Sequence, residues 1–352
     1  MRLITQQLMM DKNSPMVIRS RLRAVTQRMG FHEVQRERIQ IAASELMSNQ
    51  IKFATGAGLF QVWEHLSPIP ALDLFALDFG PGISDLSQAL TDGFSTAQTL
   101  GRGLGSIGRA ADIFDIYTRT RTPGPGPNVW YGTAAWARFI PGDQASFRHP
   151  RGLRTGRFLR ALKDDLFNGD SIRETSSARF LNWIHLDGLG HGKNAAETAE
   201  SLYNIPTPGS DPAELLATLN LRLAGGRGAM GLAVCLDIQA RKALYAGLGD
   251  LALRCYGSEK PLKPQFPGGV LGRGGGTPGA GFFNLEDNTL ICSSSDGIVL
   301  NPDIGDFPGL RNCHPQLTAL FMGNILGRDH DDKSLFIAHF HHNTPAPPRS
   351  FP

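Results

Sequence analysis

The sequence lacks any apolar run long enough to cross a membrane, since a transmembrane helix needs about 18 consecutive apolar residues. Its first residues, Met1–Gln7, do not form the pattern of a secretory signal peptide. Cysteine is scarce, and Cys235, Cys255, Cys292 and Cys313 include no Cys-x-x-Cys pair. These absences predict a cytoplasmic protein from a reducing compartment, without a membrane segment.

A strong excess of charge of one sign is also missing. The chain carries 35 Lys and Arg against 32 Asp and Glu, a net charge of +3 at pH 7. So mild a balance does not form the basic surface with which proteins hold nucleic acid. A length of 352 residues is sufficient for two domains of ordinary size.

Glycine, in contrast, is plentiful, and its most informative cluster is Asp187-Gly-Leu-Gly-His-Gly192. The preceding residues 180–186 are mostly apolar, which predicts a buried strand that ends at Asp187. Glycines directly after that carboxylate let the backbone turn sharply and approach a ligand closely. A single Asp-Gly is most often only a hairpin turn, so other residues must support a site.

Three further acidic residues follow or precede apolar runs, namely Asp170, Asp296 and Asp331. If they converge with Asp187, each close pair of carboxylates repels by about 4 kcal/mol at an effective dielectric constant near 20. Hard divalent cations such as Mg²⁺ or Mn²⁺ offset that repulsion, because they prefer oxygen ligands. The combination therefore predicts a metal site in the second half of the chain.

The order of these motifs resembles the protein phosphatase 2C (PPM) superfamily, and within it the bacterial SpoIIE/RsbX branch. The motifs are Gly169-Asp-Ser, Asp187-Gly-Leu-Gly-His-Gly, Ser295-Asp-Gly and Asp331-Asp-Lys-Ser. The resemblance spans residues 155–342 and implies an αββα sandwich that hydrolyses phosphoserine or phosphothreonine. His191 either protonates the leaving group or is an ordinary turn residue, since the family motif does not demand a histidine there.

The resemblance also implies roles for the acidic residues. Asp187 bridges two Mn²⁺ or Mg²⁺ ions, and Gly188 binds one of them through its carbonyl. Asp296 and Asp331 bind from the other side, and Asp170 matches the upstream acidic position. Paired cations lower the pKa of a bridging water and hold the phosphoryl oxygens, so this chemistry requires no protein nucleophile.

A second set of motifs occupies the first third of the chain. Residues 36–54 place most apolar side chains at helical spacing, which predicts an amphipathic helix. Glu45 and Asn49 lie four residues apart and hence on one face, although such a pair alone is typical of a solvated surface. Two glycine clusters follow, Asp78-x-Gly80-x-Gly82 and Gly101-x-Gly103-x-Gly105.

The second glycine cluster precedes a predicted helix at 106–113, where backbone N–H groups can reach a phosphate. Residues 103–108 also fit the dinucleotide fingerprint Gly-x-Gly-x-x-Gly. A Rossmann site needs a strand directly before the glycines and an acidic residue about 20 positions later. Here the polar segment 91–102 precedes them and Asp115 comes too soon, so we set that interpretation aside.

Together, these motifs resemble the GHKL ATPase/kinase fold over residues 10–140, and specifically the RsbT-type serine kinases. The resemblance implies that Asn49 holds Mg²⁺, that Asp78 accepts a hydrogen bond from the adenine amino group of ATP or ADP, and that Glu45 is the base for an incoming serine hydroxyl. The residues implied to enclose the nucleotide are Gly80, Gly82, Gly101, Gly103 and Gly105.

The predicted fold class is α/β (α+β), a GHKL α/β sandwich at 1–142 followed by a PPM sandwich at 155–342. Residues 143–154 form the expected linker and 343–352 a disordered tail. The expected function is a bifunctional switch, a kinase and phosphatase for a STAS-domain antagonist or stressosome-type protein in a sigma-factor pathway. Alternatively, only the phosphatase is active, and the ATP-binding domain senses nucleotide or sequesters the partner. We expect neither nucleic acid nor membrane as a partner, and a dimer is one option for the oligomeric state.

Overall fold

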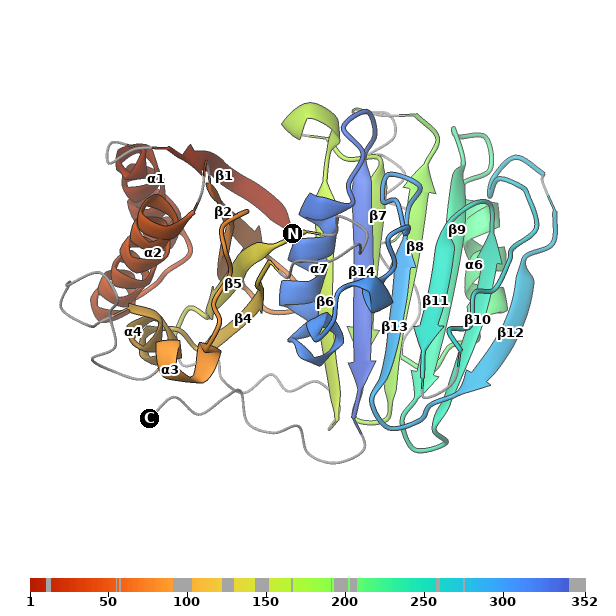
Figure 1. Ribbon diagram of the computed structural model, residues 1–352. Helices are drawn as coiled ribbons and strands as arrows, with labels where there is room; N and C mark the ends of the chain where they lie inside the picture. The colour runs from red at the N-terminus through yellow and green to blue at the C-terminus, as the bar shows by residue number, and fades with distance from the viewer. Residues whose placement is uncertain are drawn as a thin grey trace. The chain divides into compact units, whose positions relative to one another are not determined.

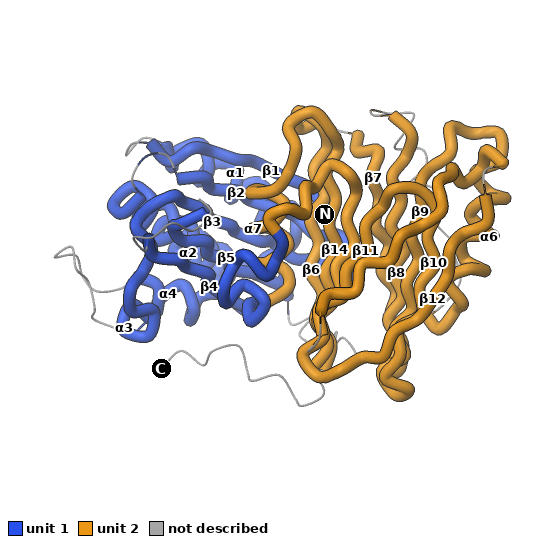
Figure 2. The backbone as a smooth tube through the Cα atoms, turned by 45° about the vertical axis from the view of Figure 1, so that its right-hand side comes forward, with its two compact units in different colours: residues 1–147, 303–313, 346–352 blue, residues 148–302, 314–345 orange. Residues whose placement is uncertain are grey.

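The chain folds into two compact units in the computed structural model (Figure 2). Unit 1 contains residues 1–147, 303–313 and 346–352, and unit 2 contains residues 148–302 and 314–345. The structure describes residues 1–10, 14–54, 56, 58–90, 103–121, 130–142, 152–165, 167–190, 192, 202, 208–257, 260–274 and 276–341. No helix in these ranges is both long and apolar enough to span a membrane.

Unit 1 is built on one antiparallel sheet of five strands. Its order is β1 (Arg2–Met9), β2 (Gly58–His65), β3 (Ala71–Leu77), β5 (Gly132–Phe139) and β4 (Ile113–Arg119). Each strand pairs antiparallel with its neighbours. Strand residues alternate between the two faces of a sheet, so each face carries its own set of side chains.

Helices cover one face of this sheet (Figure 1), namely α1 (Pro15–Arg28), α2 (Glu33–Phe53) and α4 (Gly103–Ala110), with the short α3 (Leu86–Leu90) beside α4. Apolar residues such as Leu46 of α2 and Leu74 of β3 form a common buried core. The predicted helix at 36–54 is confirmed by α2, since most of its apolar positions face this core, whereas Ile41 and Phe53 are exposed. The predicted helix at 106–113 is wrong in its bounds, since α4 begins at Gly103 and Ile113 already opens β4.

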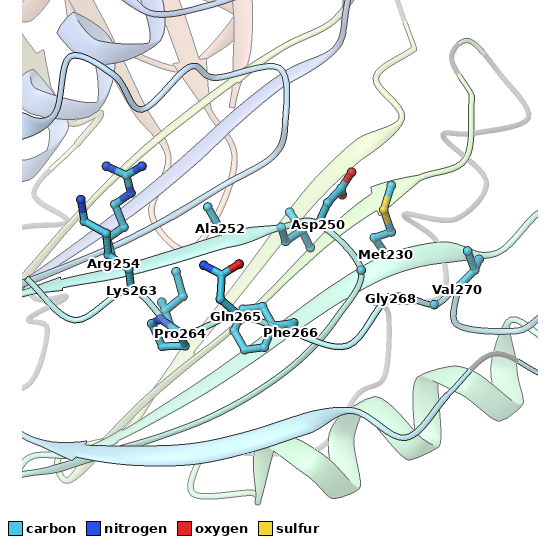
Figure 3. Close-up of a pocket in the computed structure, with 14 residues that line it drawn as sticks. Met230, Asp250, Ala252, Arg254, Lys263, Pro264, Gln265, Phe266, Gly268 and Val270 are labelled. Carbon is cyan, nitrogen blue, oxygen red and sulfur yellow. The ribbon is translucent and has the colours of Figure 1, made fainter.

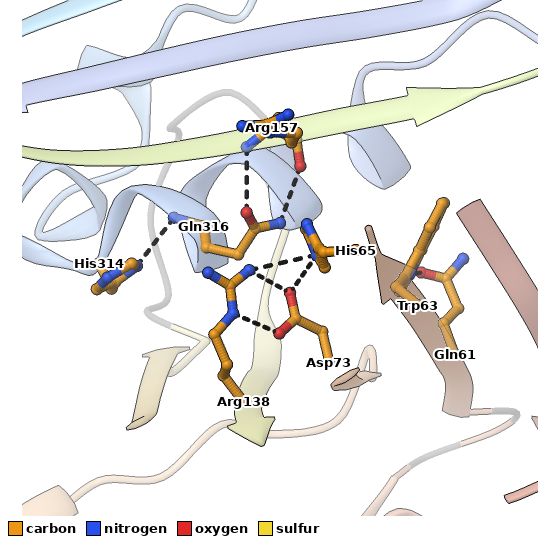
Figure 4. Close-up of polar contacts among 8 residues, drawn as sticks. All are labelled: Gln61, Trp63, His65, Asp73, Arg138, Arg157, His314 and Gln316. Carbon is orange, nitrogen blue, oxygen red and sulfur yellow. Dashed lines mark hydrogen bonds and ion pairs between the residues drawn. The ribbon is translucent and has the colours of Figure 1, made fainter. Parts of the chain in front are cut away.

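The other face of the sheet carries a buried polar cluster (Figure 4). The Asp73 carboxylate accepts hydrogen bonds from Arg138 Nε and Nη2, both at 2.7 Å, and lies 2.8 Å from His65 Nε2. Although burial alone would raise the pKa of Asp73, Arg138 and His65 hold it below its usual range. Burial lowers the pKa of His65 to about 4, so the ring is neutral at pH 7.

Unit 2 contains two antiparallel sheets (Figure 1). One has the order β12 (Gly279–Asn284), β10 (Lys242–Leu248), β9 (Ala229–Asp237), β8 (Phe180–Gly188) and β7 (Asp170–Ser176). The other has the order β11 (Ala252–Tyr256), β13 (Thr289–Ser294), β14 (Lys333–Phe340) and β6 (Leu153–Arg160).

The two sheets share an apolar core, and each carries a helix on its outer face. Trp183 of β8 and Phe336 of β14 meet in this core with ring centroids 5.0 Å apart. Helix α6 (Pro212–Arg222) packs on β9 and β10, and α7 (Pro315–Ile325) packs on β6 and β14. The order helix, sheet, sheet, helix confirms the predicted mixed α/β fold class, including the αββα sandwich.

Candidate metal centre and nucleotide site

The strand register brings Asp170 and Asp187 together. Strands β7 and β8 pair antiparallel, and Asp170 lies directly opposite Asp187. Opposed residues in an antiparallel pair point to the same face with Cβ atoms about 5 Å apart, and like charges there are destabilising. The local fold therefore holds two carboxylates side by side, an arrangement that favours a bound cation.

Asp296 and Asp331 reach the same region from the second sheet. Asp296 follows β13 and Asp331 precedes β14, and these strands are antiparallel neighbours, so both residues lie at one end of the sheet. A Cβ atom added to Gly297 would collide with the carbonyl oxygen of Asp332. The glycine of this Asp-Gly pair thus lets the two loops touch.

The pKa of Asp187 shows how close these charges are. Burial first, and then the negative charges of Asp170, Asp296, Asp250 and Asp331, together raise it to about 8. For Asp296, burial first and then the charges of Asp331 and Asp250 raise the pKa as well. The four acidic residues singled out in the sequence thus lie within electrostatic reach of each other.

Asp332 has a structural role that separates it from its neighbour. Its two carboxylate oxygens accept hydrogen bonds from the backbone N–H groups of Leu162, at 2.7 Å, and Gly169, at 2.8 Å. Those bonds fix the loop that leads into β7. Asp331, the other acidic residue of the pair, instead contributes its negative charge to the acidic cluster.

Asp250 belongs to the cluster but is absent from the predicted ligand set. It stands in the turn between β10 and β11, where Gly249 has φ +99° and allows the chain to turn beside Met230. The sequence does carry a signal, because Gly247-Leu-Gly-Asp250 ends an apolar strand in a carboxylate as Asp187 does. The sequence does not show that β10 pairs with β9 and β9 with β8, and it is this strand order that directs the turn towards Asp187.

The donor set of this centre fits a hard cation. In the parts of the chain that the structure describes, no three His, Cys, Asp or Glu side chains form a complete metal site. Mg²⁺ and related ions retain several waters and need only a few carboxylates. Gly188 ends β8 beside Asp187, where its carbonyl could add a further oxygen, whereas His191 lies outside the described residues.

A buried chain of hydrogen bonds supports Asp170 from behind. Trp183 Nε1 donates to Ser293 Oγ at 3.1 Å, and Ser293 Oγ lies 3.0 Å from His185 Nδ1. On the other side of the ring, His185 Nε2 lies 2.6 Å from Ser334 Oγ, which donates to Asp170 Oδ2 at 2.6 Å.

The direction of these bonds fixes the tautomer of His185. Burial lowers the pKa of His185 to about 3, so the ring is neutral and carries a single N–H. When Asp170 is ionised, the one hydroxyl hydrogen of Ser334 goes to its carboxylate, so Ser334 Oγ must accept from His185 Nε2–H. Nδ1 is then the acceptor for Ser293, and the whole chain donates towards Asp170.

His185→Phe is expected to destabilise the protein by about 2–4 kcal/mol, because it leaves the buried hydroxyls of Ser293 and Ser334 without their ring partner. Urea unfolding of the metal-free protein measures this change. Ser334→Ala is the matched variant, since it removes the bonds of Ser334 Oγ to Asp170 and to His185 Nε2 but keeps the bond between His185 Nδ1 and Ser293, and it should cost less. Equal stability of His185→Phe and the parent protein would show that the chain of hydrogen bonds contributes nothing.

The stability of the metal-free protein is expected to depend on pH in two opposite ways. Burial raises the pKa of Asp187 to about 8 and that of Asp170 to about 7, far above the unfolded value near 3.9. The protonated carboxyls therefore stabilise the fold fully below about pH 4, and this contribution is lost progressively as the pH rises from about 4 to about 8. His185 and His65 have lowered pKa values of about 3 and 4, so their contribution is lost as pH falls below about 6.5.

The two trends nearly cancel between about pH 4 and 6.5, so the stability of the metal-free chain is expected to fall once the pH rises above about 6.5. Mn²⁺ competes with protons for the carboxylates, so its stabilising effect should grow from pH 6 to pH 8. Thermal unfolding between pH 5 and 9, in EDTA and in Mn²⁺, measures both effects. An Mn²⁺ shift of the unfolding midpoint that is the same at every pH would contradict the assignment of these carboxylates.

In unit 1, the residues predicted for nucleotide binding gather at the C-terminal half of α2. Glu45 and Asn49 are half-buried and one turn apart on this helix. Gln50 Nε2 donates to the carbonyl of Leu77 at 3.1 Å, which places Asn49 beside the end of β3. A Cβ atom added to Gly80 would lie 2.9 Å from the carbonyl oxygen of Phe53, the last residue of α2.

Asp78 is held in place by the backbone around it. Its Oδ1 accepts hydrogen bonds from Gly80 N at 2.8 Å and Thr133 N at 3.1 Å, and burial raises its pKa. Gly82 has φ +75°, and a side chain there would collide with the backbone of Arg119.

Gly103 and Gly105 lie in the first turn of α4. Their place in the helix differs from the predicted loop, but the first N–H groups of a helix have no partner within it and still suit a phosphate. Gly101 lies outside the described residues.

The chain was compared with known protein families, sequences and solved structures. No protein-family model matches the chain. Among solved structures, it is similar to the PP2C phosphatase domain with part of the regulatory domain of SpoIIE from Bacillus subtilis (17% identity, 94% of each chain, TM-score 0.45). It is also similar to RsbX in complex with magnesium (16% identity, 53% of this chain, 95% of that one, TM-score 0.46). At TM-scores below 0.5, these similarities add nothing to the strand order described above.

A similarity in sequence is more informative. The serine/threonine-protein kinase RsbT from Bacillus subtilis (strain 168) is 38% identical over 96 residues, which make up 27% of this chain and 71% of RsbT. Because the match covers most of that relative, this chain belongs, over those residues, to the family of the serine/threonine-protein kinase RsbT.

Proposed function

We propose that the chain is a metal-dependent phosphoserine/phosphothreonine phosphatase joined to an ATP-dependent serine/threonine kinase. The phosphatase reading rests on one observation above all. Asp170, Asp187, Asp250, Asp296 and Asp331 lie within electrostatic reach of one another at the strand ends of an αββα sandwich. Burying that many like charges is costly unless cations bind among them.

The proposed phosphatase site uses the acidic residues as ligands. Asp187 and the carbonyl of Gly188 would hold Mn²⁺ or Mg²⁺ from the first sheet. Asp296 and Asp331 would hold the metal from the second sheet, and Ser334 fixes Asp170 by a hydrogen bond. Bound divalent ions would lower the pKa of a water and neutralise the phosphoryl oxygens of the substrate.

The proposed kinase site lies in unit 1. We assign it kinase activity because of the sequence similarity to the serine/threonine-protein kinase RsbT. Asp78 accepts a hydrogen bond from the adenine amino group of ATP, since two backbone N–H groups already orient its carboxylate. Asn49 holds Mg²⁺, and Glu45, one turn earlier on α2, accepts the proton of the substrate hydroxyl. Phosphoryl transfer needs mainly this positioning and a cation on the phosphate oxygens.

We further propose that both sites act in the cytoplasm on a STAS-domain antagonist or a stressosome-type protein in a sigma-factor pathway. Phosphorylation adds a charge of about −1.5 to −2 at pH 7, which is enough to make or break a docking surface. One half of the chain would add this charge and the other half would remove it.

Two assays with the purified full chain test the proposal. Phosphate release from a phosphoserine protein should require Mn²⁺ or Mg²⁺ and stop in EDTA. Transfer of label from ATP to a STAS-domain protein should require Mg²⁺. Release without transfer would leave the phosphatase alone and make unit 1 a nucleotide sensor or binding module; transfer without release would overturn the phosphatase.

A further inference from the structure

A pocket of about 600 Å³ lies in unit 2 beside the acidic cluster (Figure 3). One wall is the turn and strand that run from Gly249 to Arg254, and the opposite wall is the segment 263–270. The two walls are tied by the paired backbone of Cys255 and Leu262, with both N–H···O distances at 2.9 Å. The pocket is thus a built feature of the fold.

The chemistry of the pocket changes along its length. Asp250, a member of the acidic cluster, lies towards one end, and the side chains of Arg254 and Lys263 lie side by side at the other (Figure 3). Between them the lining is partly apolar, with Pro264 and Phe266 (Figure 3). The pocket therefore joins the metal centre to a pair of cations across an apolar floor.

We propose that this pocket binds the polypeptide that flanks the phosphorylated residue of the substrate and selects an acidic side chain in it. This inference rests on the proposed phosphatase function. Asp250 and Arg254 are four residues apart, which corresponds to about 13 Å of extended chain. A substrate segment that lies extended along this wall, with its phosphate at the metal centre, therefore places the residue about four positions away beside Arg254 and Lys263.

Charge decides which residue is selected. Carboxylates form charge-assisted hydrogen bonds with guanidinium and ammonium groups, and Arg binds them in a bidentate manner. Arg254 is half-buried at the pocket end, where water screens the pair less than on an open surface. A lysine in the substrate at the same place meets two like charges and is rejected. The site consequently distinguishes phosphoproteins by their acidic flanks.

Phosphoserine peptides test this selectivity. Each peptide carries Glu, Ala or Lys at the fourth position on either side of the phosphoserine, and p-nitrophenyl phosphate serves as a substrate without a flank. In Mn²⁺, kcat/KM is expected to be about 5- to 20-fold higher for Glu than for Ala on one of the two sides, and lowest for Lys. Equal values for Glu, Ala and Lys on both sides overturn the proposal.

A charge-reversed variant makes the test independent of any loss of folded protein. In Arg254→Glu/Lys263→Glu, the ratio of kcat/KM for the Lys peptide to that for the Glu peptide should rise above 1. An unchanged ratio overturns the proposal, and so does an equal loss for every substrate, which would place the two cations at the phosphate. Arg222→Glu on α6 is the control that should leave the ratio unaltered.

The substrate without a flank separates this inference from the function on which it rests. Hydrolysis of p-nitrophenyl phosphate with no preference among the peptides retains the phosphatase and removes the selective pocket. No metal-dependent hydrolysis of any substrate overturns the phosphatase itself and the pocket's role with it.

Discussion

Asp187→Asn is expected to lower Mn²⁺-dependent release of phosphate from a phosphoserine peptide by at least about 100-fold. The substitution keeps the size of the side chain but removes the charge that stands at the centre of the cluster. Four other carboxylates raise the pKa of Asp187. Its position is thus the one where a cation interacts with most of them, and an uncharged amide there cannot bridge two ions.

The same variant should be more stable than the parent protein when metal is absent. Ionised Asp187 is buried among like charges, so replacing it by a neutral group removes repulsion above pH 8. Thermal unfolding in EDTA at pH 8.5, beside the phosphate assay, distinguishes a lost ligand from a lost fold. Activity that survives in Asp187→Asn would refute the assignment of this residue as a metal ligand.

Asp237→Asn provides the matched control. Asp237 ends β9 and pairs with Arg179 at 2.6 Å, whereas Asp187 lies opposite Met230 near the start of that strand. The control thus changes the same residue type in the same sheet, at the opposite end. Because exposed ion pairs contribute little to stability, both its activity and its unfolding midpoint should remain close to those of the parent protein.

The sequence indicated part of the acidic cluster because Asp187 and Asp296 each stand at the end of an apolar strand. A continuous apolar run such as β8 or β13 can be recognised locally, and the residue where it stops is read directly from the pattern. Asp187 and Asp296 could be identified from the sequence in this way. The register that sets Asp170 opposite Asp187 could not, since it depends on which strands pair.

The features that the sequence missed all depend on contacts between distant segments. Asp250 carries the same local signal as Asp187, but only the turn beside Met230 directs it to the cluster. The chain from Trp183 through His185 to Ser334 joins three strands, and no spacing rule links those positions. Arg254 and Lys263 face one pocket because Cys255 of β11 pairs with Leu262, a pairing that no local periodicity encodes.

Glu45→Gln is expected to reduce transfer of phosphate from ATP to the partner protein by about 10²- to 10⁴-fold, the usual contribution of a general base. Glutamine retains the shape and hydrogen-bonding reach of the side chain but cannot take up the hydroxyl proton. Nucleotide affinity should change little, because Asp78 and Asn49 remain in place. Transfer of label and ATP binding, measured on the same preparation, therefore separate the two roles.

Glu37→Gln on the same helix isolates the effect of position. Glu37 is exposed on α2 two turns before Glu45, far from the end of β3 where Gln50 anchors the helix to Leu77. Its replacement should leave both transfer and ATP binding unaltered. Full transfer by Glu45→Gln would mean that another group accepts the proton. Loss of ATP binding together with transfer would instead show that Glu45 supports the shape of the site, since a base that acts only on the hydroxyl has no influence on the bound nucleotide.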